Sequence, residues 1–115
     1  MATPSRMRAR SQGGRNAEVD LMLLLEAEGW VCGSRRHIGG AGDILAVSVS
    51  QRTRLIEVKT TAGGPYERFG PADREALSRT AAAIGADAYL VWRVTPRDEW
   101  KWLSKAVWPS GGHRG

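Results

Sequence analysis

Three charged residues interrupt two apolar segments that have the composition of neighbouring strands. Asp43 lies in GlyAspIleLeuAlaVal (42–47), and Glu57 and Lys59 lie in LeuIleGluValLys (55–59). Strands of this composition are normally buried, and a buried charge is costly unless it has a partner. Two adjacent carboxylates also repel each other, so both stay ionised only if a cation lies between them. The pattern therefore predicts a divalent-metal site.

Lys59 is expected to share that site with Glu57. Because side chains alternate across a strand, Glu57 and Lys59 point to one face, whereas Ile56 and Val58 pack on the other. Lysine is scarce in this chain, in which arginine provides most of the positive charge, so general basicity does not explain Lys59. The alternative is an ion pair on the solvent face of an edge strand. Asp43 and the features described next favour the metal site.

The composition is that of one small basic domain. The chain has 115 residues and a net charge of +5, with an isoelectric point near 10.1, which suggests a polyanionic partner. Its single cysteine, Cys32, excludes an internal disulfide and lacks the neighbours of a zinc site. No segment approaches the ~20 apolar residues of a membrane span, and the amino terminus lacks the apolar core of a signal peptide. We therefore expect an intracellular protein that does not bind membranes.

Positive charge gathers at the amino terminus. Residues 1–14 are rich in Ser, Gly and Pro and indicate a disordered basic arm that can reach phosphates. A folded domain is expected over 15–108 and a flexible tail over 109–115. The arginines of the arm are Arg6, Arg8 and Arg10. Two further arginine pairs either ring the candidate site or belong to solvated loops: Arg35 with Arg36, and Arg52 with Arg54.

A leucine-rich helix is expected between Asn16, as its cap, and Glu28, with Gly29 ending it. Its five consecutive apolar residues (21–25) cover almost the whole circumference, so this helix should be buried on more than one side. The second side is either the contact with another subunit or part of a single core. Glu18 falls on the apolar stripe of the helix, which makes it a third carboxylate that points toward the interior or its rim.

The remaining pattern predicts strands, turns and one more helix around a mixed sheet. Glycines before Asp43 permit close approach of the backbone to a ligand. The expected elements are strands at 30–34, 43–49 and 54–60, a hairpin turn at 50–53, a flexible loop at 62–70, a helix at 71–84 that starts with Pro71 and ends before Gly85, and strands at 88–94 and 100–106.

This order of elements and four motifs resemble the PD-(D/E)XK nuclease superfamily. Within it the chain resembles the archaeal-type (Hjc-like) Holliday junction resolvases, which also occur in phages. The motifs are GlyArgAsnAlaGlu (14–18), GluGlyTrp (28–30), GlyAspIleLeuAla (42–46) and IleGluValLysThr (56–60). The resemblance covers residues 14–102. It implies a restriction-endonuclease-like single domain of the α/β class, with a central mixed β-sheet flanked by helices.

The resemblance also implies a magnesium-dependent phosphodiesterase, in which Mn²⁺ substitutes for Mg²⁺. Asp43, Glu57 and the Val58 carbonyl would bind the metal, with Glu18 as a further direct or water-mediated ligand. Lys59 would orient or help deprotonate the attacking water and offset negative charge on the phosphorane. Arg15 matches a family arginine near the scissile phosphate. Further candidate DNA contacts, in the place of a family loop that carries a serine, are Ser34, Arg35, Arg36 and His37.

Such resolvases act in DNA recombination and repair as homodimers that make two symmetric nicks in a four-way junction. The partners implied are therefore branched DNA and a second copy of the chain, with no small-molecule substrate. A restriction-like, nicking or repair endonuclease of the same superfamily would share Asp43, Glu57 and Lys59. A catalytically silent DNA-binding module is a further alternative, although carboxylates beside a polyanion weaken binding unless a metal intervenes.

Overall fold

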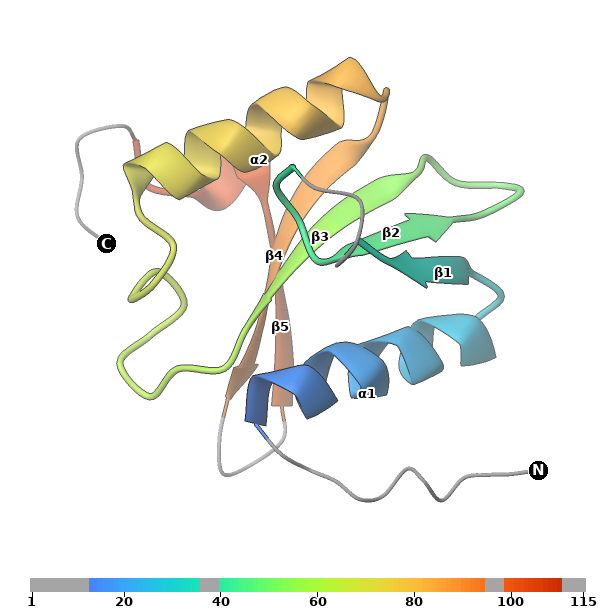
Figure 1. Ribbon diagram of the computed structural model, residues 1–115, viewed down its shortest axis with the longest axis horizontal. Coiled ribbons are helices and arrows are strands. Elements are labelled where there is room, and N and C mark those ends of the chain that lie inside the picture. Colours follow the sequence, from blue (N-terminus) through green and yellow to red (C-terminus); the bar gives the residue numbers. More distant parts are fainter. Residues whose placement is uncertain (1–12, 36–39, 95–98, 111–115) are drawn as a thin grey trace.

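Five strands form one mixed sheet in a computed structural model that describes residues 13–35, 40–94 and 99–110 (Figure 1). The strands are β1 (Val31–Ser34), β2 (Ile44–Val47), β3 (Arg54–Lys59), β4 (Asp87–Val94) and β5 (Glu99–Ser104). They lie side by side in the order of the sequence, so β3 occupies the centre of the sheet. All neighbouring pairs are antiparallel except β3 and β4, which are parallel.

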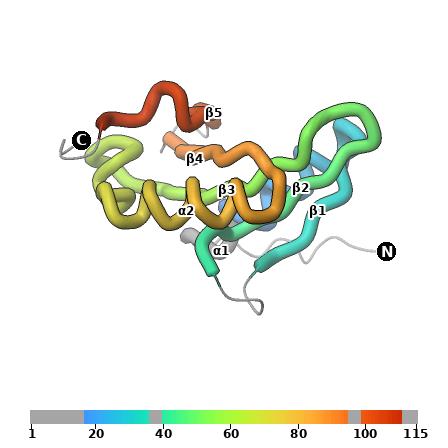
Figure 2. Tube along the Cα trace, turned by 90° about the horizontal axis from the view of Figure 1, so that it is seen from above, coloured from blue at the N-terminus to red at the C-terminus, as the bar shows by residue number. Residues whose placement is uncertain are grey.

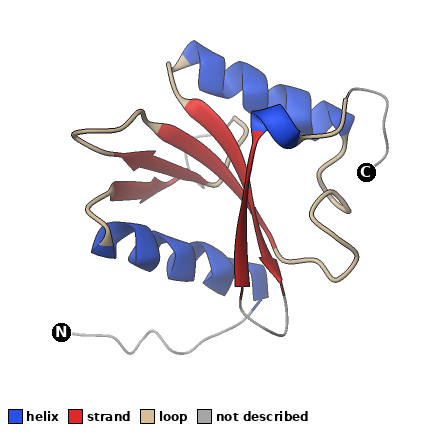
Figure 3. Cartoon of the chain, turned by 180° about the vertical axis from the view of Figure 1, so that it is seen from behind, coloured by secondary structure: helices blue, strands red, loops and turns tan. Residues whose placement is uncertain are grey.

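The helices α1 (Gly13–Ala27) and α2 (Pro71–Ala83) lie on opposite sides of the sheet (Figure 3). A parallel pair of strands needs a crossover, and α2 supplies it between β3 and β4. Seen from above, α2 runs along the sheet beside β3 and β4 (Figure 2). A short 3₁₀ helix, η2 (Lys105–Val107), follows β5. In the described part of the chain, no helix has the length and apolar content that crossing a membrane requires.

Each helix buries one stripe of side chains against its own side of the sheet. Ala17, Leu21 and Leu25 recur at the four-residue spacing of one helix face and are almost fully buried. Leu21 and Leu25 pack in one core cluster with Ile56 of β3. The second cluster lies under α2, and its members are Leu55, Phe69, Leu77, Ala81, Ala86, Ala88 and Leu90.

The predicted types and order of the elements are confirmed, with differences at the ends. The first helix begins at Gly13, three residues before the expected cap Asn16, and the remaining arm (1–12) lies outside the described residues. Glycine adopts helical dihedrals at a small cost, so the two glycines at 13 and 14 do not stop the helix. The expected tail is described only at Pro109 and Ser110.

The expectation that α1 is buried on more than one side of a single core is wrong. Val19, Leu23 and Leu24 are 45%, 53% and 47% exposed, respectively. In a domain with one sheet, α1 has only that sheet to pack against, so its outer side is left to solvent. The apolar run therefore exceeds what the single subunit buries.

Candidate active site

Backbone hydrogen bonds hold Asp43 opposite Glu57. The antiparallel register of β2 and β3 pairs Ile44 with Ile56, which sets Asp43 level with Glu57 at the next position. The Asp43 N–H donates to the Ile56 carbonyl at 2.7 Å, and the Val58 N–H donates to Oδ2 of Asp43 at 2.8 Å. The carboxylate is thus fixed by the neighbouring strand, as the predicted hairpin required.

Gly42 allows Asp43 to reach this position. Its φ of +97° lies in the region that favours glycine, and a Cβ atom there would stand 2.7 Å from Cδ1 of Leu55 and 3.3 Å from Cδ1 of Leu77. Both the backbone conformation and the close packing under α2 therefore require glycine immediately before the carboxylate.

Glu57 and Lys59 form an ion pair within the sheet. Nζ of Lys59 lies 3.4 Å from Oε2 of Glu57, and the two side chains are 24% and 19% exposed. The alternative of a solvated pair on an edge strand is wrong, because β3 is the central strand. Both residues alternate with Ile56, which packs under α1, and share a face with Leu55, which packs under α2. The pair therefore lies on the α2 side of the sheet.

The pKa of Glu57 is raised to about 7, first because the carboxyl is buried and next because Asp43 is close by. Lys59 opposes this rise through its charge and a hydrogen bond, but does not cancel it. Burial and the repulsion from Asp43 together therefore outweigh the compensation by Lys59. A divalent cation would relieve that repulsion, so the donor set of Asp43 and Glu57 fits a hard metal ion such as Mg²⁺.

Asp73 is an additional acid near the site that the sequence reasoning missed. It lies in the first turn of α2, where its Oδ2 accepts the Gly70 N–H at 3.3 Å, and its charge also raises the pKa of Glu57. An acid in the first turn of a helix is common for capping reasons, so its position in the sequence gives no functional signal.

Glu18 lies on α1, half-buried beside the Ala17 and Leu21 stripe. This helix covers the face of the sheet opposite to the one that carries Glu57. Across the described ranges, no three His, Cys, Asp or Glu side chains come close enough to hold one metal ion. Glu18 is therefore not gathered with Asp43 and Glu57 into a preformed group of three acids.

The predicted DNA contacts are only partly described. Ser34 ends β1 and is exposed, while Arg35 is half-buried, and Nη2 of its guanidinium would stand 2.8 Å from a Cβ atom at Gly40. Arg15 belongs to α1, but the placement of its side chain is not described. The remaining predicted contacts lie outside the described residues: Arg6, Arg8, Arg10, Arg36 and His37.

The arginines at 52 and 54 do not ring the site. The guanidinium of Arg54 lies over three aromatic rings, 4.7 Å from Trp30, 4.8 Å from Tyr89 and 5.0 Å from Trp102. These rings belong to the α1 side, opposite to Glu57. Arg52 forms an exposed ion pair with Asp87 at 3.0 Å. Neighbouring positions in a sequence can thus serve different faces of one sheet.

The connection after Lys59, which was expected to be a flexible loop over 62–70, is hydrogen-bonded near both of its ends. Nε1 of Trp92 donates to the Thr61 carbonyl at 2.9 Å, and Nη1 of the buried Arg74 donates to the Phe69 carbonyl at 2.7 Å. Phe69 is buried and meets Trp108 edge to face at 5.2 Å. These contacts hold the loop that leaves β3.

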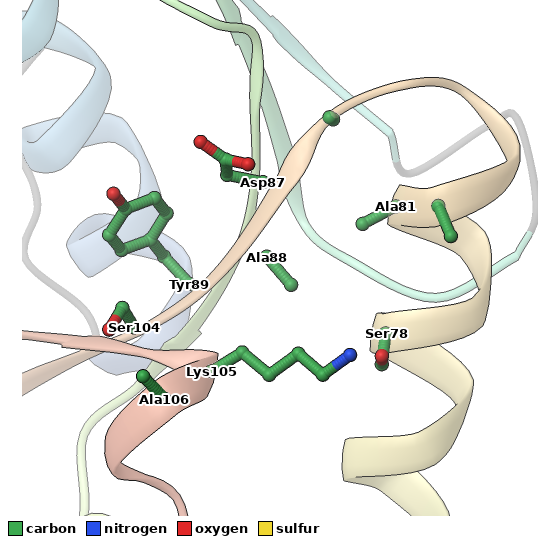
Figure 4. Close-up of a pocket in the computed structure, with 10 residues that line it drawn as sticks. Ser78, Ala81, Asp87, Ala88, Tyr89, Ser104, Lys105 and Ala106 are labelled. Atoms are coloured by element: carbon green, nitrogen blue, oxygen red, sulfur yellow. The ribbon is translucent and has the colours of Figure 1, made fainter.

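Two hollows occur elsewhere on the described surface. One has a volume of about 340 Å³ and lies between α2 and η2, where the amino end of Lys105 extends toward Ser78 (Figure 4). Half of the residues that line it are alanines, and none of the predicted site residues lines it. The other is a groove of about 420 Å³ between α1 and β5. Neither hollow contains the acids, so the candidate site is the charged end of β3.

The sheet order, the helices on its two faces and the acids on its central strands together define a restriction-endonuclease-like fold. Among solved structures, the chain is similar to Hjc, a Holliday junction resolvase from the archaeal hyperthermophile Archaeoglobus fulgidus. The similarity has a TM-score of 0.70 and 26% sequence identity and covers 81% of this chain and 78% of that protein. No protein-family profile matches the chain, and no curated protein matches it by sequence.

Proposed function

We propose that this protein is a magnesium-dependent endonuclease that cuts branched DNA, with the four-way junction as its substrate. The observation that carries the proposal is the pairing of Asp43 with Glu57 beside Lys59 on the central strands of a fold similar to that of Hjc. Two half-buried carboxylates that repel each other make the fold less stable, so their presence calls for a functional reason.

Asp43, Glu57 and the Val58 carbonyl are the oxygen donors that would hold Mg²⁺, and Mn²⁺ would substitute. When bound, the ion would polarise the scissile phosphate and lower the pKa of a nearby water. Oδ2 of Asp43 accepts the Val58 N–H, which holds the carboxylate in place beside Glu57. Glu18 remains a candidate for contact through water.

Lys59 has two tasks in this proposal. Its ammonium group, next to Glu57, would orient the attacking water, and it would offset the negative charge that develops on the phosphate in the transition state. The raised pKa of Glu57 also suits it to exchange protons near neutral pH in the metal-free protein.

Branched DNA suits the charge of the chain. A net charge of +5, with arginines concentrated near the amino terminus, favours contacts with backbone phosphates over base-specific ones. Recognition would then depend on the shape of the DNA and weaken steeply as salt rises. A homodimer would place two equivalent sites on the two equivalent strands of a junction, which gives two symmetric nicks.

The test is cleavage of a mobile four-way junction and of a linear duplex of the same sequence, each with Mg²⁺ and with chelator. We expect symmetric nicks near the crossover in Mg²⁺ only, and none with Glu57→Ala. Equal cutting of the linear duplex would favour a restriction-like, nicking or repair nuclease of this fold instead. Tight junction binding without any cutting would overturn the proposal in favour of a silent binding module.

A further inference from the structure

The outer side of α1 carries an apolar face that the subunit does not bury. It consists of Val19, Leu23, Leu24 and Ala27, all of which are exposed. Asp20 lies within this face by helical spacing, but Arg93 neutralises it through an ion pair of 2.9 Å. Monomeric proteins rarely leave such a continuous apolar strip in water, so a partner surface is expected here.

The charges at the two ends of α1 indicate what that partner is. The first turn contains no acid and the last turn no base, whereas Arg15 stands near the start and Glu26 near the end. Both placements oppose the helix dipole, which favours negative charge at the start and positive charge at the end. A second helix of the same sequence, lying antiparallel, would bring an acidic end to each basic end and oppose the two dipoles.

We propose that a second copy of this chain packs on α1 across a two-fold axis, with the two α1 helices antiparallel. A two-fold interface must be complementary to itself, and a helix with an apolar face, a base near its start and an acid near its end meets that condition when paired antiparallel. In the register expected, Val19 of each copy meets Leu23 of the other. The proposal rests on the homodimer of the proposed function and assigns its surface.

The groove beside α1 gives the interface a depression to fill. It has a volume of about 420 Å³, and its lining combines apolar and aromatic side chains with one acid and one base: Leu21, Leu24, Leu25, Glu28, Arg54, Tyr89, Trp100 and Trp102. Leu24 belongs both to the exposed face and to the wall of this groove. Apolar side chains of the second copy would therefore pack against tryptophan rings, which are frequent anchors of protein interfaces.

The test measures the dimer dissociation constant of the full chain by sedimentation, comparing Leu23→Arg with Val49→Arg. Val49 is fully exposed in the connection between β2 and β3, away from α1. Val49→Arg therefore also replaces an exposed apolar side chain by arginine, but outside the apolar face of α1. We expect Leu23→Arg to raise the dissociation constant about 30-fold or more and Val49→Arg to leave it unchanged. A monomeric wild type, or the reverse ranking, overturns the proposal.

A charge exchange tests the antiparallel arrangement itself. Glu26→Arg and Arg15→Glu should each weaken the dimer, whereas the double variant should recover most of the loss, because the opposite charges then meet again. Weakening that simply adds in the double variant would contradict the antiparallel pairing. Circular dichroism of each variant checks that the fold is kept.

The cleavage assay separates this inference from the proposed function. If Leu23→Arg is monomeric and still makes single Mg²⁺-dependent nicks but not paired ones, both stand. If the wild type is a dimer through α1 yet cuts no DNA, the interface stands and the nuclease proposal fails. If cleavage is paired while Leu23→Arg leaves the dimer intact, the nuclease proposal stands and this surface is wrong.

Discussion

Strand β3 holds buried charge at both of its ends, and the two ends treat that charge in opposite ways. At its start, Arg54 is surrounded by Trp30, Tyr89 and Trp102, so the cation is compensated by ring faces. At its end, the carboxyl of Glu57 lies beside Asp43 and Lys59, and its pKa is raised to about 7. The first arrangement is complete within the chain, whereas we propose that an added cation completes the second.

The comparison teaches how to separate a structural charge from a functional one. A structural charge has partners on every side and contributes to stability. A functional charge keeps a shortage of partners that a ligand can fill, and the fold bears the cost. The charges at the two ends lie on opposite faces of the sheet, so variants at one end should leave the other unchanged.

The largest effect is expected from Asp43→Asn. The amide oxygen can still accept the Val58 N–H, so the free energy of unfolding should change by less than about 1 kcal/mol. The loss of one metal-binding charge should lower Mg²⁺-dependent cleavage about 10³-fold. Single-turnover cleavage and urea unfolding of the same preparations measure both quantities. Equal activity in the variant would remove Asp43 from the site.

Arg54→Ala should have the reverse profile. Removal of the guanidinium leaves a void among three rings, so the free energy of unfolding should fall by about 3–4 kcal/mol, while cleavage per folded molecule is unchanged. Arg52→Ala is the matched control, because it breaks only an exposed ion pair and should cost less than about 0.5 kcal/mol. A specific loss of cleavage in Arg54→Ala would contradict the separation of the two ends.

The stability of the metal-free protein should depend on Glu57 and on pH. Its pKa of about 7 in the folded state exceeds the ordinary value of 4.5, so the folded state binds the proton more tightly. The contribution of protonated Glu57 to the free energy of unfolding is therefore complete below about pH 4.5. It is lost as the pH rises through about 7. Glu57→Gln should remove that loss, which amounts to at most about 3 kcal/mol at pH 8.

Urea unfolding of both proteins from pH 4.5 to 8 measures this difference. Added Mg²⁺ should stabilise the wild type at pH 8 and have a smaller effect on the glutamine variant, because ligands stabilise the state that binds them. A difference between the two proteins that stays constant with pH would show that Glu57 keeps an ordinary pKa.

The smallest effect is expected from Gly42→Ala, which should cost about 2 kcal/mol of stability and displace Asp43. Gly64→Ala is the control, because Gly64 also has a positive φ, of +121°, but has nothing within 4 Å of an added Cβ atom. The difference between the two variants isolates the contacts with Leu55 and Leu77. If both lose the same stability and neither loses activity, close packing before Asp43 is not needed.

The acid pair was predictable because its signal is local. Two apolar strands joined by a short polar turn form a hairpin, and the hairpin sets Asp43 level with Glu57 whatever the rest of the fold does. The alternation along β3 likewise predicted that Glu57 and Lys59 share a face. These inferences need neither the helices nor the far strands.

Other features depend on which helix covers which face, and the sequence does not contain that information locally. Arg54 was expected near the site because it is close to Glu57 in the sequence. Side chains alternate along a strand, however, and an odd number of positions separates the two residues, so they lie on opposite faces of the sheet. Asp73 and Trp92 come close to the end of β3 that carries Glu57 only through the parallel crossover by way of α2. One side of α1 is exposed because no further layer of structure covers it in the described part of the subunit. The apolar run at 21–25 does not predict how many layers the fold has.

The hydrogen bond between Val58 and Asp43 has a consequence for how this protein can vary in evolution. It fixes the hairpin at the end opposite to the turn at 48–53, so the register of the two strands does not depend on the length of that turn. Extra residues there would cost little, since doubling the length of a loop adds only about 0.6 kcal/mol. The turn is therefore the place where descendants of this chain can accept insertions, and new binding specificities with them, without moving either acid.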